Sequence, residues 1–263
     1  MKNQEVDLYI LGAGVSTPAH LTLEVLDALK KCKVLYTVIR QPKEEWLPVS
    51  VDIEVISYWK LFKSGDFRTN NYNLAVETIL SAVKTQKPVA YLTPGNPVVF
   101  DSVSHALIQQ GRERGYKVVV CAGISSIDTL LVDLVQDVTP GLQVYDASSV
   151  VLYDINLNPC FPVILFQVDV FGSNRALHGI NLPLDYLVPL KNHLLKFYPG
   201  NHEVVFVRSQ TSKDTDGRMN KMKIKDLDNV DSREEMGTSL FIPTSEILQT
   251  KSKDFLSSMN APM

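Results

Sequence analysis

The chain has 263 residues, of which 45% are hydrophobic and 21% charged, with a net charge of -3 and an isoelectric point near 6.0. This composition provides for a large core and excludes global disorder. A near-neutral total without a basic stripe gives no indication of a nucleic-acid partner. The three cysteines lack paired spacing, which argues against a disulfide framework and a zinc site, so we expect no metal. No apolar run suits a membrane span or a signal peptide, and we expect a cytoplasmic protein with no membrane partner.

The first half of the chain alternates strands and helices. Thr17 followed by Pro18 predicts the start of the first helix, because this pair suits the N-cap and first-turn positions. The predicted strands are Val6–Gly12, Val34–Ile39, Asp52–Tyr58, Pro88–Thr93 and Tyr116–Gly123, and the later helices Tyr72–Thr85, Phe100–Arg114 and Ser125–Val135. Such an alternation predicts an α/β fold with a mainly parallel sheet.

The second half is richer in strands, and we place a domain boundary near Pro140. Residues 1–140 then form an N-terminal α/β domain with a mainly parallel sheet, and residues 141–263 a C-terminal α/β domain. The predicted strands are Leu142–Asp146, Ser149–Asp154, Pro162–Val168, Glu203–Arg208, Met222–Leu227 and Ser239–Pro243, and the predicted helices Leu184–Tyr198 and a capped helix near the end of the sequence.

Three loops follow strands at the edge where open α/β sheets bind ligands, namely 12–17, 93–100 and 122–126. The first, GAGVSTP, has Thr17 where a dinucleotide fingerprint requires a third glycine, which disfavours a Rossmann-type oxidoreductase. The second, TPGNPVVF, holds one glycine and two prolines, so it predicts a rigid loop whose backbone groups face outward.

In order and spacing, GAGVSTPAHLT, TPGNPVVF and AGISSID resemble the three motifs of the tetrapyrrole-methylase fold, a family that uses S-adenosylmethionine. The sequence departs from the family pattern at Ser16, Thr17 and Asn96. The matching residues are Gly12, Gly14, Leu21, Thr22, Gly95, Pro97, Phe100, Gly123, Ile124, Ser125 and Ser126.

This resemblance implies two α/β domains with a cofactor cleft between them. It also implies that S-adenosyl-L-methionine is the cofactor. The cofactor-binding residues that the resemblance implies are Gly95, Asn96, Val99, Phe100, Ser125 and Ser126 in the first half, and Gln167 and Ser239 in the second.

Within the family, the chain looks closest to the borosin type, which methylates backbone amide nitrogens of a peptide. The resemblance rests on Tyr58, Arg68 and Tyr72, on VSHALI, and on FYPGNHEVVFV. Borosin enzymes commonly have YGHPGVF where this chain has PGNPVVF, so the tyrosine of that loop is Pro94 here. The end of the sequence shows no long apolar tail, so the resemblance implies a precursor peptide acting in trans, and it also implies a homodimer.

The chemistry gives Tyr58, Arg68 and Tyr72 possible catalytic roles. A backbone amide nitrogen is a poor nucleophile because its lone pair is delocalised into the carbonyl. An arginine beside a tyrosine favours the phenolate, which could act as the base, and the arginine could stabilise charge on the carbonyl oxygen. Which tyrosine is the base stays open. In the alternative interpretation, Tyr72 is a boundary residue of its helix and Arg68 pairs at the surface with Asp66 or Glu77.

The leading hypothesis is therefore an S-adenosylmethionine-dependent methyltransferase that acts on peptide amide nitrogens. A first alternative is methylation of a tetrapyrrole or another small metabolite. A second, of another class, is a non-catalytic S-adenosylmethionine-binding scaffold or sensor, which the departures at Ser16, Thr17, Pro94 and Asn96 motivate.

Overall fold

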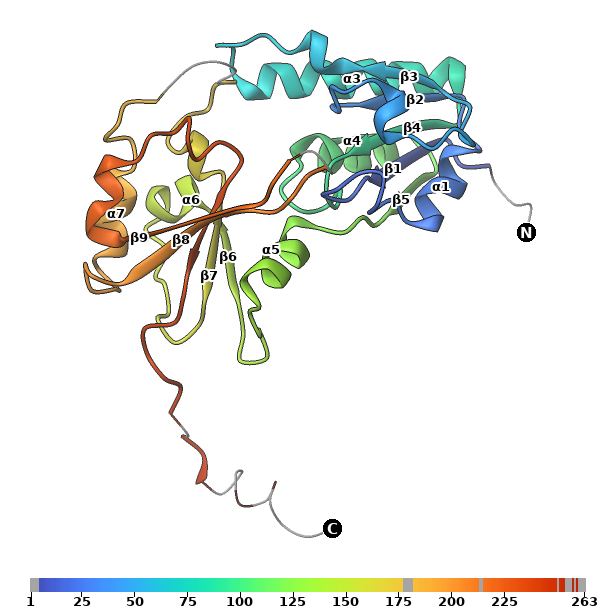
Figure 1. The fold of residues 1–263 in the computed structure, drawn as a ribbon. Coiled ribbons are helices and arrows are strands. Elements are labelled where there is room, and N and C mark those ends of the chain that lie inside the picture. Colours follow the sequence, from blue (N-terminus) through green and yellow to red (C-terminus); the bar gives the residue numbers. More distant parts are fainter. Residues whose placement is uncertain are drawn as a thin grey trace. The chain divides into compact units, whose positions relative to one another are not determined.

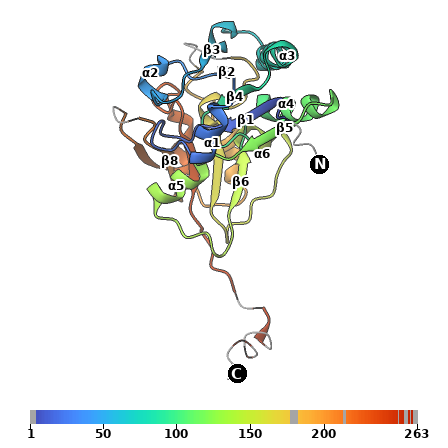
Figure 2. The same cartoon turned by 90° about the vertical axis from the view of Figure 1, so that its right-hand side faces the viewer.

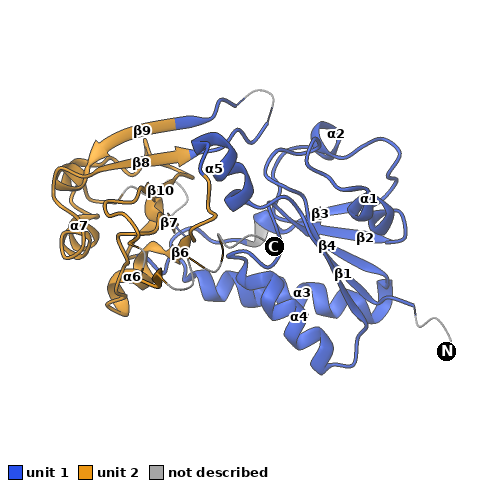
Figure 3. Cartoon of the chain, turned by 90° about the horizontal axis from the view of Figure 1, so that it is seen from below, with its two compact units in different colours: residues 1–136, 173–181, 208–218 blue, residues 137–172, 182–207, 219–263 orange. Residues whose placement is uncertain are grey.

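A computed structural model describes residues 5–176, 182–212, 215–249, 251–253, 257 and 259 (Figure 1). The chain forms two compact units (Figure 3). Unit 1 contains residues 1–136, 173–181 and 208–218, and unit 2 contains residues 137–172, 182–207 and 219–263. The division at residue 140 stays a prediction. No sequence pattern indicated that residues 173–181 and 208–218 of the second half group with unit 1.

Unit 1 is built on a five-stranded parallel sheet of order β3-β2-β4-β1-β5, which can be followed in Figure 2. Every residue of β1, β2 and β4 is buried, as expected for strands covered on both faces. The strands are β1 (Leu8–Gly12), β2 (Val34–Thr37), β3 (Glu54–Ser57), β4 (Val89–Thr93) and β5 (Val118–Cys121). The predicted parallel α/β architecture is confirmed.

Helices cover both faces of this sheet, with α1 and α2 on one side and α3 and α4 on the other (Figure 3). The helices of unit 1 are α1 (Leu23–Leu29), α2 (Lys43–Trp46), α3 (Arg68–Gln86), α4 (Ser102–Glu113) and α5 (Ser126–Leu134), with a 3-10 turn η1 (Tyr58–Leu61). Cys32 and Cys121 are buried, as their apolar surroundings predict. Among the described residues, no helix has the length and apolar character needed to span a membrane.

The predicted start of the first helix at Thr17 is wrong. The N-cap of α1 is Thr22, whose hydroxyl accepts a hydrogen bond from the Val25 backbone N–H at 3.2 Å. The Thr17 hydroxyl instead donates to the Ala13 carbonyl at 3.2 Å. Both threonines suit a helix start by type, but only Thr22 directly precedes the helical residues.

Unit 2 is built on a mixed sheet of order β6-β7-β10-β8-β9, in which β10 is antiparallel to β7 and β8 while β6 and β7 are parallel. Its strands are β6 (Gln143–Asp146), β7 (Val163–Phe166), β8 (Glu203–Arg208), β9 (Arg218–Lys223) and β10 (Ser239–Ile242). Its helical elements are α6 (Ala147–Leu152), η2 (Val168–Val170), α7 (Val188–Leu194) and η3 (Ile224–Asn229).

Two predicted strands of unit 2 are wrong. Ser149–Asp154 is largely helical, because Asp146 caps α6 by accepting from the Ser149 N–H at 2.8 Å, and Ala147 and Val150, three residues apart, are fully buried on one helix face. In Met222–Leu227 the strand β9 ends at Lys223 and the helical turn η3 begins at Ile224. The predicted terminal helix falls partly outside the described residues.

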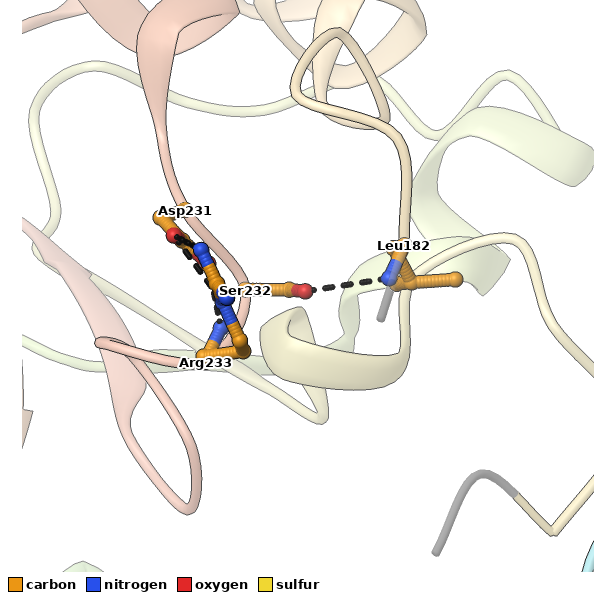
Figure 4. A network of polar contacts seen from close by, with 4 residues as sticks. All are labelled: Leu182, Asp231, Ser232 and Arg233. Carbon is orange, nitrogen blue, oxygen red and sulfur yellow. Dashed lines mark hydrogen bonds and ion pairs between the residues drawn. The ribbon is translucent and has the colours of Figure 1, made fainter. Parts of the chain in front are cut away.

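Polar contacts hold the segment that leads to β10 in unit 2. The Ser232 hydroxyl accepts from the Leu182 backbone N–H at 3.2 Å, and Arg233 Nε lies 3.0 Å from Asp231 Oδ1 (Figure 4). These bonds anchor the chain shortly before Ser239, the first residue of β10.

Candidate functional site

The three loops predicted at the carboxyl edge of the parallel sheet meet in unit 1 around Gly12, Gly95 and Gly123, which we call the glycine junction. The Gly14 N–H donates to the Gly95 carbonyl at 3.1 Å, and the Gly95 N–H donates to the Gly14 carbonyl at 2.9 Å. The first loop is thereby paired with the second, as an isolated antiparallel bridge.

Packing at the glycine junction leaves no room for side chains. A Cβ on Gly123 would lie 2.3 Å from the Gly95 carbonyl oxygen and 2.7 Å from the Gly12 carbonyl carbon. A Cβ on Gly12 would lie 2.5 Å from the Gly123 nitrogen. All these neighbours are backbone atoms of the adjoining loops, which cannot move aside as a flexible side chain could. The glycines are therefore needed for more than a tight turn. They allow three loops to approach closely.

The second loop turns sharply beside the junction. Asn96 Oδ1 accepts from the Val98 N–H at 3.1 Å, and the Val99 N–H donates to the Asn96 carbonyl at 3.0 Å. Phe100 has a φ of 54° and remains 42% exposed, a strained conformation for an aromatic residue. Nothing lies within 4 Å of a Cβ built on Gly95, so the loop borders open space. This rigid, outward-facing backbone fits the approach of a ligand.

In the third loop, Ser125 and Ser126 begin α5, but the Ser125 hydroxyl already has partners. It donates to Asp128 Oδ2 at 2.8 Å and accepts from the Asp128 N–H at 3.3 Å. Asp128 Oδ2 also accepts from the Ser125 N–H at 2.8 Å, which completes a capping box. A hydroxyl used in this way is poorly suited to binding a cofactor by donation.

The two remaining predicted cofactor residues lie together in unit 2. Gln167 follows β7 directly with a φ of 59°, and Ser239 is the buried first residue of β10. These strands are antiparallel neighbours with Leu240 opposite Leu165, so Gln167 and Ser239 share one end of the sheet. Sequence reasoning had no local pattern that joined them.

Tyr58 belongs to a buried chain of polar groups in unit 1. Its hydroxyl lies 2.8 Å from the Tyr91 hydroxyl, which donates to Asp101 Oδ2 at 3.1 Å. Because the Tyr91 hydroxyl donates its one hydrogen to the carboxylate, the Tyr91 oxygen accepts a hydrogen bond from the Tyr58 hydroxyl. Tyr58 is only 2% exposed and Tyr91 only 1%. Tyr58 therefore lies behind the surface of the site.

Arg68 and Tyr72 occupy the first turns of α3, four residues apart on one face. Arg68 hydrogen-bonds the Tyr72 phenol, and its Nη2 also donates to the Ser173 carbonyl at 2.6 Å. The Arg68 backbone N–H donates to the Asn174 carbonyl at 2.9 Å. The segment 173–176 of unit 1 thus anchors the guanidinium, although it lies about a hundred residues away in sequence.

Ring contacts connect these residues into one group. The Phe62 ring centroid lies 5.4 Å from that of Tyr58 and 6.1 Å from that of Tyr72. We call Tyr58, Phe62, Tyr72, Tyr91 and Asp101 the phenol cluster. The structure therefore brings together Tyr58, Arg68 and Tyr72, the three residues predicted from the sequence to be catalytic. Their roles stay a prediction.

The expectation that arginine makes a tyrosine a phenolate is wrong for the free protein. Burial raises the pKa of Tyr72, and the charge and hydrogen bond of Arg68 lower it by less. Burial also raises the pKa of Tyr58, and the nearby Asp101 charge adds to the increase. The increase in pKa from desolvation of the phenolate is larger than the decrease caused by Arg68, so both phenols keep their protons at neutral pH.

The two carboxylates considered as surface partners of Arg68 accept hydrogen bonds from other groups in the structure. Glu77 Oε1 accepts from Arg114 at 2.8 Å, and Asp66 Oδ1 accepts from the Phe67 N–H at 2.7 Å. Sequence reasoning missed Tyr91 and Asp101. Tyr91 was hidden in an apolar strand, but Asp101, three residues before Ser104 at a helix start, carried a readable N-cap signal.

Comparison with known proteins assigns a family to this combination of fold and loops. The sequence pattern of the Tetrapyrrole (Corrin/Porphyrin) Methylases matches residues 7–154, more than half of the 263 residues. The chain therefore belongs to the tetrapyrrole methylase family.

Relatives in sequence include a methyltransferase/ribosomally synthesized type I borosin cyclic peptide precursor from Serendipita vermifera subsp. bescii, 29% identical over 75% of this chain and 48% of that protein. Another such precursor, from Cerrena unicolor, is 26% identical over 91% of this chain and 59% of that protein. The chain thus spans about half the length of these relatives.

Solved structures with the same fold include two tetrapyrrole enzymes. Uroporphyrin-III-C-methyltransferase from Thermus thermophilus has a TM-score of 0.58 and 17% identity over 90% of this chain and 91% of its own. Cobalt precorrin-4 methyltransferase has a TM-score of 0.60 and 16% identity over 90% and 94%. At these identities the likeness shows the fold alone.

Proposed function

We propose that this protein is an S-adenosylmethionine-dependent methyltransferase that methylates backbone amide nitrogens of a separate precursor peptide. The observation that carries the proposal is the hydrogen bond of Arg68 to Tyr72, a member of the phenol cluster, in the same unit as the glycine junction. The names of the borosin relatives, each a methyltransferase joined to a peptide precursor, support the choice of acceptor.

The backbone of the second loop fits the proposed cofactor. The strained, exposed loop beside open space at Gly95 offers backbone donors and acceptors rather than charges. When bound, S-adenosylmethionine supplies an electrophilic methyl group. The residues proposed to hold it are Gly95, Asn96, Val99, Phe100, Ser125, Ser126, Gln167 and Ser239.

Arg68 and Tyr72 are proposed to bind the carbonyl oxygen of the acceptor amide. The Tyr72 oxygen accepts from Arg68, so the phenol proton remains for donation to that carbonyl. Charge moves onto the carbonyl oxygen as nitrogen becomes a better nucleophile, and a donor placed there contributes about 3 kcal/mol to stabilising the transition state. The raised pKa of Tyr72 suits this role as donor better than the role of base.

The partners proposed are a precursor peptide in trans and a second copy of the chain, with neither nucleic acid nor membrane. The cytoplasm is the proposed location. We also keep the division into domains 1–140 and 141–263 as part of the proposal.

The test has two stages. Calorimetry with S-adenosylmethionine measures binding, and production of S-adenosylhomocysteine is then measured with peptides encoded beside the gene. Tight binding with turnover on a peptide is expected. Binding without turnover on any peptide or metabolite indicates the non-catalytic scaffold instead. No binding of the cofactor contradicts both.

Methylation of a tetrapyrrole or other small metabolite is the second candidate. Pro94, at the place of a tyrosine in the borosin loop, favours it, because one phenol of the expected acceptor site is replaced. A methyl group appearing on uroporphyrinogen and on no peptide would establish this candidate.

A further inference from the structure

Asp101 connects the cofactor loop to the phenol cluster. It directly follows Phe100 and caps α4, with Oδ1 accepting from the Ser104 N–H at 3.0 Å. Its Oδ2 accepts from the Tyr91 hydroxyl at 3.1 Å, and Tyr58 supports Tyr91 from behind. The carboxylate is half-buried, whereas both phenols behind it are almost fully buried. Both carboxylate oxygens are therefore held by donors on rigid elements.

The charge of Asp101 reaches the whole cluster. Burial makes the largest contribution to the raised pKa of Tyr58, Tyr72 and Tyr91, and the negative charge of Asp101 adds a smaller increase to each. Arg68 lies beside Tyr72, and the His105 ring, one turn along α4, is bonded to the Val98 carbonyl at 3.2 Å. The other groups named here are phenols, the Arg68 guanidinium and the His105 imidazole, so Asp101 is the carboxylate among them.

Transfer of a methyl group to an amide nitrogen releases a proton that some group must accept. The nitrogen lone pair forms the bond to the methyl carbon, the carbon–sulfur electron pair stays with sulfur, and the N–H electron pair remains on nitrogen. The proton leaves as the new bond forms, because a methylated amide nitrogen that keeps its proton is strongly acidic. The buried phenols are poor acceptors, since a phenolate there is desolvated.

We propose that Asp101 accepts this proton as the general base of the reaction, and that Tyr91 and Tyr58 are positioning residues that orient its carboxylate. This inference rests on the proposed function and deepens it. Arg68 and Tyr72 then act on the carbonyl oxygen of the acceptor, and Asp101 acts on its nitrogen. The two tasks fall to groups from α3 and from the start of α4.

Asp101→Asn tests the inference, because asparagine is an equally good N-cap and keeps the shape of the side chain. With a peptide that the wild type methylates, we expect kcat to fall about 100-fold, the effect of losing a general base. KM for the peptide and the affinity for S-adenosylmethionine should stay unchanged. The fall of the remaining rate toward acid pH should disappear, since the group that must be ionised is gone. Tyr91→Phe should lower kcat by about tenfold and keep the acid limb.

Asp146→Asn is the matched control, because Asp146 caps α6 in unit 2 with the same geometry. It should leave kcat and the pH profile unchanged. A wild type with turnover and an Asp101→Asn variant of equal kcat would overturn the inference and leave the proposed function intact. A wild type without turnover on any peptide would overturn the proposed function and the inference with it.

A second measurement needs no acceptor. In protein labelled with 3-fluorotyrosine, Asp101→Asn should move the fluorine resonances of Tyr91 and Tyr58, while Asp146→Asn should not. Resonances that stay in place would show that Asp101 does not contact the phenols, and would overturn the positioning part of the inference.

Discussion

The glycine junction and the phenol cluster lie in the same unit but are built by different means. At the junction, backbone atoms pack against backbone atoms, and any Cβ on Gly123 would overlap the neighbouring loops. In the cluster, side chains from η1, α3, β4 and the start of α4 meet through rings and hydroxyls. One region tolerates only glycine, whereas the other depends on the particular polar atom of each side chain.

The two regions therefore restrict the amino-acid sequence for different reasons. Backbone packing at the junction decides whether three loops can form one surface, so a change there should affect stability first. The cluster keeps its rings when one oxygen is removed, so a change there should affect chemistry more than folding. The following experiments test that separation.

Gly123→Ala should have the largest effect on stability. The added Cβ would lie 2.3 Å from the Gly95 carbonyl oxygen and 2.7 Å from the Gly12 carbonyl carbon, and the Gly95 loop cannot retreat without breaking its pairing with Gly14. We expect a loss of about 3 kcal/mol in the free energy of unfolding, measured by chemical denaturation. Gly200→Ala is the control, since its Cβ would make only ordinary contacts at 3.5 Å and 3.6 Å. Equal stability of the two variants would refute the close packing of the junction.

Arg68→Lys should leave the fold intact and lower kcat about 100-fold, or about 2.7 kcal/mol in the activation free energy. A lysine cannot bond both the Ser173 carbonyl and the Tyr72 phenol with a planar fork. Turnover with the peptide substrate and thermal unfolding should be measured together. Arg114→Lys is the control, because Arg114 follows α4 and pairs at the surface with Glu77 of α3, the helix that carries Arg68. A loss of stability that accounts for the loss of turnover would contradict a role in chemistry.

Tyr58→Phe should cost about 1.5 kcal/mol in the free energy of unfolding, because it removes a buried hydrogen bond and leaves the ring in place. Tyr153→Phe, at a tyrosine that is 71% exposed, should change stability by no more than about 0.5 kcal/mol. Denaturant titrations of both variants give the comparison. If Tyr58→Phe were as stable as the wild type, Tyr58 and Tyr91 would not be bonded in solution.

Asp7→Asn addresses the opposite, amino end of the parallel sheet. Burial raises the pKa of Asp7, but bonds from Lys87 at 2.8 Å and from the Lys117 N–H at 2.8 Å outweigh it and hold the pKa below the usual 3.8. A depressed pKa stabilises the fold above the unfolded-state pKa, and this contribution is lost as pH falls through the folded-state value.

The Asp7→Asn variant should therefore be less stable than the wild type by about 1 kcal/mol at pH 7. The difference should shrink as pH falls below about 4. Stability of both proteins against pH gives the measurement, and Asp27→Asn, which alters an exposed pair with Lys30, is the control. A difference that grew toward acid pH would have the wrong sign for a depressed carboxyl pKa.

Much of the fold could be predicted because its signals are local. Apolar runs marked the five parallel strands of unit 1, and the spacing of the loops placed Gly12, Gly95 and Gly123 at one edge of the sheet. The strand predicted at Ser149–Asp154 failed because the Asp146 cap and burial at helical spacing outweighed the β-branched residues.

The candidate site was less predictable because its contacts join distant parts of the chain. Tyr91 lies in a strand that reads as pure core, yet its hydroxyl bonds Tyr58 and Asp101. The anchoring of Arg68 by the Ser173 carbonyl has no local signal. The sign of the Tyr72 pKa shift depended on its burial, which the sequence pattern did not reveal.

The central claim is methylation of a backbone amide nitrogen. The most direct test is to express the protein together with the peptide encoded beside its gene, and to locate added methyl groups by fragmentation mass spectrometry. The account predicts methyl groups on backbone nitrogens of that peptide in the wild type, and their loss in the Arg68→Lys variant. Methyl groups on side chains alone, or an unmodified peptide beside a methylated small metabolite, would contradict it.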